Sequence, residues 1–289
     1  MKSIRYYRWA ADLVQRRITA FTRALPDVFI LGATKAGSST LAYMLWQHPE
    51  HVRPLAKELM YLQQLPVFRS NWESTRVSSF LWGRYRDGHA RYSVSGYRKF
   101  FPTAREMRRL SKTGKPITSD CDPFNLYCET AMRRIAKLAR RPRFIVSLRD
   151  PIRRAFSDFN MHRTNGERDA RSFAQAIDDE LSGAEKRFRK RFIHQSVYAP
   201  HVERLLATFP RDQLLIIKAE DLFSDPALIA RQLFSFLELD PVPVDCSTQN
   251  RGTYSDPIDP ASEDRLRKYF RPFNQRTYDL VGRDFGWDS

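Results

Sequence analysis

Cysteine is scarce in this chain of 289 residues, which has only three, at positions 121, 128 and 246. They form no CxxC pair, and none stands with histidines at the spacing that a structural zinc site requires. The six histidines are scattered along the chain as well. The sequence therefore predicts neither a metal site nor a disulfide framework.

The sequence also lacks a long apolar run, an internal repeat and a low-complexity linker. Residues 2–23 are basic and partly amphipathic, but they never reach the roughly 20 apolar residues that a membrane span needs. We therefore expect a cytoplasmic protein in which residues 1–26 form a basic helical segment and residues 27–289 form one domain. The basic segment could pack on this domain or make a peripheral contact with an anionic membrane surface.

Positive charge, in contrast, is abundant: 49 Lys and Arg against 33 Asp and Glu give a net charge of +16. Such a field attracts nucleotides, acidic glycans, nucleic acids or an anionic membrane without choosing among them. The arginine-rich run 187–191 would suit a nucleic-acid-binding protein, but no recognised nucleic-acid module accompanies it. Because solvated helix faces explain such runs equally well, we predict no nucleic-acid partner.

Short apolar runs alternate with helical patterns along most of the chain. Apolar runs over 28–31, 144–148 and 214–217 predict buried strands, and helical spacing predicts helices over 129–139, 172–181 and 202–209. Pro151 and Pro260 each stand where a helix would begin, the latter after Asp259 as N-cap. This alternation predicts one α/β domain with a central parallel β-sheet flanked by helices. We expect an irregular insertion over 66–115.

A turn rich in small residues follows the first predicted strand, in the segment Thr34-Lys35-Ala36-Gly37-Ser38-Ser39-Thr40-Leu41. An ATP-binding P-loop would have its lysine at position 38, where this chain has serine, and the lysine lies inside the loop instead. Backbone amides at a helix N-terminus, together with the hydroxyls, would suit a phosphate. A tight strand-to-helix turn without a ligand is the alternative.

This segment resembles the 5′-phosphosulfate loop of sulfotransferases that use 3′-phosphoadenosine-5′-phosphosulfate (PAPS). Residues 149–158 in turn resemble the 3′-phosphate element of that family, in which an arginine and a serine eight positions later bind the phosphate. Those residues are Arg149 and Ser157 here. Both could converge on one dianion, because Pro151 would begin a helix and Ser157 would lie about two turns along it. Taken alone, the segment could equally be a strand-to-helix junction with a surface salt bridge.

Residues 250–260 and the end of the chain resemble the carboxy-terminal part of glycosaminoglycan sulfotransferases, where a basic, glycine-containing loop closes over the nucleotide. This chain departs from the pattern at Thr253, where those enzymes tend to have a second basic residue. The resemblance implies a PAPS site formed by Lys35, Ala36, Gly37, Ser38, Ser39, Thr40, Arg149, Ser157, Arg251, Gly252 and Thr253.

The segment 55–61 resembles the one in which carbohydrate sulfotransferases place a catalytic glutamate, which would be Glu58 here. A carboxylate can take the proton from an incoming hydroxyl, and Lys35 would neutralise the phosphate oxygen that leaves. Glu58 could instead be a solvated glutamate paired with Lys57. His51 and His162 are weaker candidates for the base.

Residues 119–127 are similar to the acidic segment that follows the second strand and contacts the acceptor in these enzymes. On that basis Lys57, Asp120 and Asp122 are predicted to bind substrate. Animal heparan-type members usually carry Glu-Lys where this chain has Asp120 and Cys121, so their acceptor preference does not transfer directly. A plain turn before Pro123 is the alternative.

Taken together, the resemblance implies a P-loop-nucleotide-kinase-like sulfotransferase fold over residues 27–289. It also implies in-line transfer of the sulfuryl group from PAPS to a hydroxyl or amine of an acceptor, expected to be a carbohydrate, with release of adenosine 3′,5′-bisphosphate. A metal is not expected, since a sulfuryl group carries less charge than a phosphoryl group. The alternatives are a P-loop kinase that uses ATP and a sulfotransferase that acts on a lipid or aryl acceptor.

Overall fold

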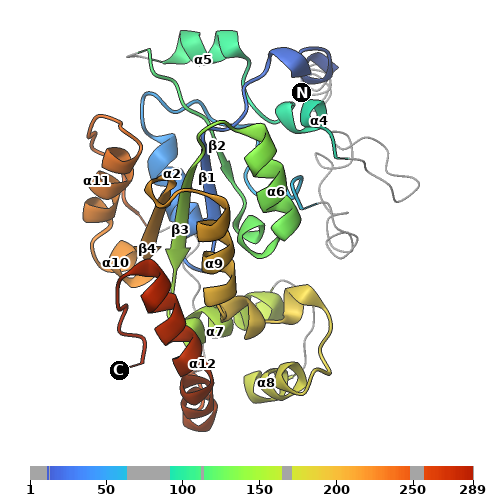
Figure 1. Ribbon diagram of the computed structural model, residues 1–289, viewed down its shortest axis with the longest axis vertical. Helices are drawn as coiled ribbons and strands as arrows, with labels where there is room; N and C mark the ends of the chain where they lie inside the picture. The colour runs from blue at the N-terminus through green and yellow to red at the C-terminus, as the bar shows by residue number, and fades with distance from the viewer. Residues whose placement is uncertain are drawn as a thin grey trace, which may run out of the picture.

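A four-stranded parallel sheet lies at the centre of the protein (Figure 1). The computed structural model describes residues 12, 14–63, 92–111, 114–164, 171–247 and 257–288. Its strands stand in the order β2-β1-β3-β4, and their bounds are β1 Val28–Gly32, β2 Ser119–Cys121, β3 Arg143–Leu148 and β4 Leu214–Lys218. The three strands that the sequence predicts are therefore confirmed within one residue.

Both faces of the sheet are covered by helices. Along β1 the side chains alternate, with Phe29 and Leu31 entering one apolar core and Val28 and Ile30 entering another. The second core is closed by α2 (Ser38–Trp46), α10 (Ala219–Ser224) and α11 (Pro226–Phe236). The first is closed by α6 (Glu129–Leu138), α9 (Ala199–Thr208) and α12 (Pro260–Val281). The predicted fold class, a parallel sheet with helices on both faces, is confirmed.

Two helices lie beyond the carboxyl ends of the strands (Figure 1). They are α7 (Pro151–Thr164) and α8 (Phe173–Leu181), which pack with the start of α12 in a third apolar core that includes Phe159, Phe173 and Leu266. Pro151 is the first residue of α7, as predicted. The predicted N-cap of α12 is also present, since Asp259 accepts a hydrogen bond from the Ser262 amide at 2.8 Å.

The described part of 66–115 is more regular than the sequence predicts. It contains α4 (Val94–Arg98) and α5 (Ala104–Leu110), and α5 begins with a capping box in which Thr103 and Glu106 bond each other's backbone. The insertion is therefore not irregular in its described part, because local capping supports helices too short to show a period. Short 3-10 turns complete the structure, at η1 Ala20–Thr22, η3 Pro123–Tyr127, η4 Phe188–Lys190, η5 His194–Ser196 and η6 Arg211–Gln213.

The second strand also differs from the prediction. Residues Ser119–Cys121, expected to follow the second strand, themselves form β2, so that Asp120 lies within the strand and Asp122 directly after it. The strand order reverses between β1 and β3, since the chain continues from β1 to one side and from β3 to the other. In open α/β sheets, ligands bind outside the carboxyl ends of the strands at such a switch point. The loops after β1 and β3 meet there.

Candidate active site

The loop after β1 is held from several sides. Ser147 of β3 donates a hydrogen bond to the Ala36 carbonyl at 2.6 Å, and Ala36 is fully buried. Gly37 precedes α2 with φ at 86°, and a Cβ there would come within 2.6 Å of Leu222 Cδ2. Glycine is therefore required at this position by both conformation and space. Lys35 also has a positive φ, 62°, which is uncommon outside glycine and must be supported by its surroundings.

Two cations meet at the switch point. Arg149 Nη1 donates to the Lys35 carbonyl oxygen at 3.1 Å, and its guanidinium lies over the ring of Phe223, 5.7 Å from the centroid. Lys35 Nζ lies against α7, 3.4 Å from Met161 Sδ. Within the described ranges neither cation forms an ion pair, and burial lowers the pKa of Lys35 while the nearby Asp158 opposes that change. An anion bound beside the N-terminus of α2 would supply the missing counter-charge.

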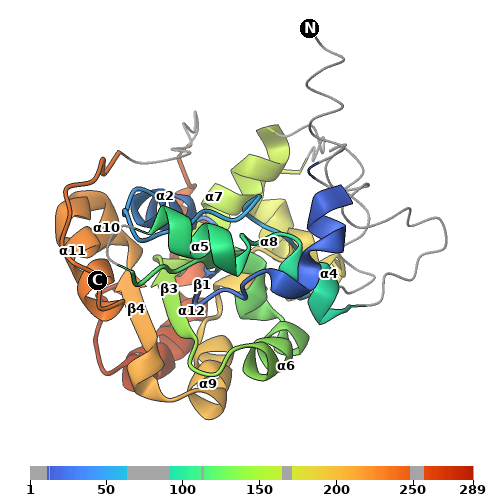
Figure 2. The same ribbon diagram turned by 90° about the horizontal axis from the view of Figure 1, so that it is seen from above.

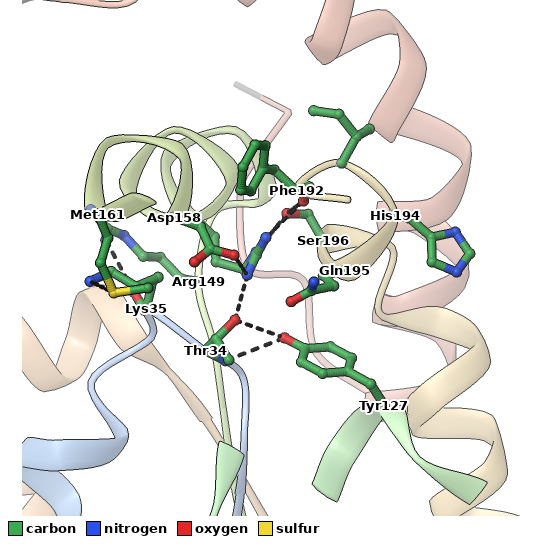
Figure 3. Close-up of polar contacts among 12 residues, drawn as sticks. Thr34, Lys35, Tyr127, Arg149, Asp158, Met161, Phe192, His194, Gln195 and Ser196 are labelled. Carbon is green, nitrogen blue, oxygen red and sulfur yellow. Dashed lines mark hydrogen bonds and ion pairs between the residues drawn. The ribbon is translucent and has the colours of Figure 1, made fainter. Parts of the chain in front are cut away.

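A fully buried arginine fixes the loop to α7, and Figure 3 labels its partners Thr34, Asp158, Phe192 and Ser196. Arg154 donates to Thr34 Oγ1 at 2.6 Å, to Ser196 Oγ at 2.7 Å and to the Phe192 carbonyl at 2.7 Å, and it pairs with Asp158 at 3.2 Å. Every side of the guanidinium is thus engaged, as a buried charge requires. The prediction of site residues did not include Arg154. Its i, i+4 spacing from Asp158 indicated a pair, but nothing in the sequence indicated its burial.

Ser157 lies on α7 and is buried, with 1% of its surface exposed. It stands four residues before Met161, whose sulfur contacts Lys35, so both side chains lie on one face of the helix. The structure therefore brings Lys35, Arg149 and the Ser157 face of α7 together. Ser38 and Thr40, in the first turn of α2, are also buried. The remaining predicted nucleotide contacts, Arg251, Gly252 and Thr253, lie outside the described residues.

Lys57 connects the proposed base to the phosphate loop. Its Nζ lies 2.7 Å from Glu58 Oε1 and donates to Ser39 Oγ at 2.6 Å. The Lys57 and Glu58 pair anticipated by the alternative interpretation is therefore present. The pair is also anchored to the first turn of α2 through Ser39, and the Lys57 side chain is only 22% exposed. The Glu58 side chain keeps 40% of its surface exposed, which leaves it accessible to an acceptor.

The backbone around Glu58 is held in an unusual conformation. Glu58 and Met60 have φ of 56° and 52°, and each such residue costs roughly 1–2 kcal/mol unless it is supported. Two hydrogen bonds to the end of β2 supply the support: the Glu58 amide donates to the Cys121 carbonyl at 2.8 Å, and the Met60 amide to Asp122 Oδ2 at 2.6 Å. The other carboxylate oxygen of Asp122 accepts from the Phe124 amide at 3.2 Å. One carboxylate thus joins the Glu58 segment to the turn after β2.

Asp120 and Asp122 are both buried. The Tyr97 hydroxyl donates to Asp120 Oδ2 at 2.5 Å. Burial, followed by the negative charge of Asp122, raises the pKa of Asp120 to about 8, and burial followed by the charge of Glu58 raises that of Asp122 to about 6. Asp122 thus supports the Glu58 segment, whereas Asp120 Oδ1 is buried without a hydrogen-bond partner among the described residues.

The weaker base candidate His51 is buried against Ser119, with Nε2 at 2.9 Å from Ser119 Oγ. Burial lowers its pKa to about 3, which makes it a poor proton acceptor at neutral pH. Within the described ranges, no group of three or more His, Cys, Asp or Glu side chains is placed to hold a metal ion.

Comparison with known proteins identifies the family. The sequence model of the sulfotransferase family matches residues 26–243. Mouse heparan sulfate glucosamine 3-O-sulfotransferase 3A1 is 27% identical over an alignment of 293 positions. The alignment covers 93% of this chain and 66% of the relative. Human heparan sulfate glucosamine 3-O-sulfotransferase 5 is 24% identical over 303 residues, 96% of this chain and 78% of the relative. The chain thus spans about two thirds to three quarters of the length of these relatives.

Solved structures share the architecture. A sulfotransferase from Alicyclobacillus acidocaldarius superposes with a TM-score of 0.67 at 24% identity, over 92% of this chain and 100% of that one. The sulfotransferase domain of the Synechococcus PCC 7002 olefin synthase gives a TM-score of 0.51 at 17% identity, over 90% and 94% of the two chains. At these identities the likeness establishes the fold. Because the family match covers most of the sequence, the chain belongs to the sulfotransferase family of enzymes.

Proposed function

We propose that this protein transfers the sulfuryl group of PAPS to a hydroxyl or amine of a carbohydrate acceptor and releases adenosine 3′,5′-bisphosphate. Besides membership of the family, one observation carries the proposal: Arg149 donates to the Lys35 carbonyl at 3.1 Å. This contact joins two phosphate-binding elements that are far apart in the sequence. A nucleotide with phosphates on both its 5′ and 3′ sides would engage both elements at once.

On the donor side, Lys35 and the amides that begin α2 bind the 5′-phosphosulfate, and Arg149 and Ser157 bind the 3′-phosphate. An arginine can make two parallel hydrogen bonds to a phosphate, which fixes orientation as well as affinity. Lys35 stabilises the negative charge that develops on the 5′-phosphate oxygen as the sulfur–oxygen bond breaks. Since neither cation is neutralised by a carboxylate in the described structure, this charge is available to the nucleotide.

On the acceptor side, Glu58 takes the proton from the incoming hydroxyl or amine while the acceptor's oxygen or nitrogen forms the new bond to sulfur. The leaving phosphate oxygen departs on the opposite side of the sulfur, in line with the attack. Lys57 pairs with the Glu58 carboxylate and links it to Ser39 in the first turn of α2. Its two contacts set the distance between base and donor before the acceptor arrives.

Two observations favour a glycan acceptor. The two relatives described above are named as heparan sulfate glucosamine 3-O-sulfotransferases. The net charge of +16 would attract an acidic chain of sugars. Cys121 is buried and stands where those enzymes tend to have a lysine, so the acceptor is expected to differ from theirs in its contacts near β2. A lipid or aryl acceptor is the competing possibility.

A donor assay tests the proposal. The protein is incubated with isotopically labelled PAPS, or with labelled ATP and Mg²⁺, and with panels of sugars, lipids and phenols. Transfer from PAPS to a sugar is expected, and turnover of ATP in place of PAPS would instead establish a kinase. Lys35→Ala should lower kcat by about 100-fold or more, as expected when a charge-stabilising group is removed. Arg149→Ala should instead weaken binding of adenosine 3′,5′-bisphosphate by about tenfold or more, measured by calorimetry.

A further inference from the structure

A layer of short helices covers the end of the molecule nearest the amino ends of the strands, and Figure 2 looks onto this end. We call it the end layer and define it as residues 14–23 and 92–111, which include η1, α4 and α5. Its segments are tied together by three arginines. Arg16 donates to the Lys99 carbonyl at 3.1 Å, Arg98 to that of Phe21 at 2.8 Å, and Arg23 to that of Phe101 at 2.8 Å. The end layer is thus one connected surface.

Large apolar side chains are exposed mainly on this layer. Of the seven that are exposed among the described residues, five belong to it: Val14, Ile18, Phe21, Val94 and Leu110. The first three stand at i, i+4 and i+7, so they follow one face of the segment. Ile18 is 67% exposed and Phe21 75%. Single exposed apolar residues are ordinary, but a concentration of them marks an interaction surface.

Basic residues are frequent in the same segments. Residues 14–23 and 92–111 contain eight Lys and Arg and one acidic residue, Glu106, and a second acid, Asp12, stands just before them. Both acids have partners within the protein: Asp12 pairs with Arg16 at 2.8 Å, and Glu106 accepts from the Thr103 amide at 2.6 Å. Along α5, three exposed arginines, at 105, 108 and 109, form no ion pair with any described residue. The layer therefore carries an excess of uncompensated positive charge next to exposed apolar groups.

We propose that the end layer docks on the surface of a membrane that contains anionic phospholipids. The apolar side chains would enter the boundary between headgroups and acyl chains, and the arginines would contact the lipid phosphates. A free polyanion would engage only the arginines and leave Ile18 and Phe21 in water. A second copy of the layer would bring like charges together. The interface of an anionic membrane complements both features.

The contact would be peripheral. None of the described helices combines the length and the apolar character needed to cross a bilayer. The candidate active site lies at the carboxyl ends of the strands, and the end layer lies across the opposite end of the sheet (Figure 1). Docking would leave the loop after β1 facing the aqueous side, so this proposal stands independently of the proposed reaction.

Vesicle sedimentation tests the proposal. The full chain is mixed with vesicles of phosphatidylcholine alone or with added phosphatidylserine, and the bound fraction is measured at low and high salt. Binding is expected to require phosphatidylserine and to weaken as salt rises. The double variant Ile18→Ser and Phe21→Ser, and separately the triple variant Arg105→Ala, Arg108→Ala and Arg109→Ala, should each bind at least about tenfold more weakly. Circular dichroism should show that both remain folded.

Leu228→Ser is the matched control, because Leu228 is an exposed apolar residue on α11, away from the end layer. It should bind vesicles like the unchanged protein. Equal binding to both vesicle types, or unchanged binding by the Ile18 and Phe21 variant, would overturn the proposal. Two further outcomes would also overturn it: retention on heparin that depends on the three arginines while vesicle binding is absent, or a dimer in the ultracentrifuge that the apolar variant abolishes.

Discussion

The donor side and the acceptor side of the candidate site are held by different means. On the donor side, the loop after β1 is fixed by β3 and by Arg154, which makes four contacts in a fully buried setting. On the acceptor side, Glu58 and Met60, which both have positive φ, are held by two hydrogen bonds, from the Glu58 amide to the Cys121 carbonyl and from the Met60 amide to the Asp122 carboxylate. The donor side is therefore redundantly supported, whereas the acceptor side depends on few contacts.

This difference matches what each side must do. Every reaction would use the same nucleotide, so its site can be built into the core of the sheet. An acceptor must enter and leave, and the 40% exposure of the Glu58 side chain is compatible with the acceptor role proposed for it. Binding residues are commonly carried on loops that a rigid scaffold positions. The following variants test whether the two sides are separable.

Glu58→Gln should give the largest effect and should be confined to the acceptor side. Without the proton acceptor, kcat should fall by about 10² to 10⁴, while the affinity for adenosine 3′,5′-bisphosphate should remain within twofold. Steady-state kinetics and calorimetry measure the two quantities. Glu129→Gln, an exposed glutamate paired with Arg133, is the control. A normal kcat for Glu58→Gln would remove this residue from the mechanism.

Arg154→Met should affect the donor side through stability. It leaves the buried carboxylate of Asp158 without its partner, which should lower the free energy of unfolding by about 3–5 kcal/mol in urea titrations. Arg133→Met breaks a pair with the same i, i+4 spacing that is exposed to solvent, and it should cost less than about 1 kcal/mol. Equal effects of the two variants would mean that the Arg154 network does not hold the loop.

Asp122→Ser tests how strongly the acceptor side depends on one carboxylate. Serine can still cap the Phe124 amide but is too short to reach the Met60 amide, so Glu58 should lose its position and kcat should fall by about tenfold. The loss should disappear in a Glu58→Gln background, because a residue that acts through Glu58 has nothing left to position. Asp225→Ser is the control, because it makes the same change at an ordinary helix N-cap, where serine can still accept the hydrogen bond from the Leu228 amide. A full tenfold loss in both backgrounds would indicate a general structural effect.

Asp120→Asn should have the smallest effect, visible as a change in the pH dependence of stability. The folded protein raises the pKa of this carboxyl to about 8, so it retains a proton that the unfolded chain releases above pH 4. The native state therefore loses stability as pH rises from about 4 to 8. Asparagine does not titrate, so it removes this pH-dependent loss of stability, and its side-chain oxygen can still accept the hydrogen bond from Tyr97. Relative to the unchanged protein, the variant should gain about 1 kcal/mol or more between pH 5 and pH 8 in urea titrations, and parallel curves would contradict the assignment.

Much of the donor side could be predicted from the sequence. Apolar runs such as 144–148 mark buried strands. The family resemblance assigns Lys35 and Arg149 to one nucleotide site, and the structure brings the two residues into contact. The strand β2 escaped prediction because Ser119–Cys121 is short and polar, and its side chains are satisfied only by tertiary partners such as His51 and Tyr97.

The supporting residues could not be predicted for a related reason. The burial of Arg154 and the link from Asp122 to the Met60 amide depend on which elements come together in space. Neither a helical period nor a short motif encodes such contacts. The roles that the family resemblance assigns to Glu58, Asp120 and Asp122 stay predictions, to be decided by the variants above.

Lys57 is shared between the two sides, since its ammonium contacts both Ser39 and Glu58. A nucleotide that forms a hydrogen bond with the Ser39 hydroxyl would replace one of the two contacts of Lys57. The position of Lys57 would then change its interaction with the Glu58 carboxylate. By thermodynamic reciprocity, an acceptor that engages Glu58 must alter nucleotide affinity by the same factor. The binding of the two substrates should therefore be coupled through the ammonium group of Lys57, with either positive or negative cooperativity.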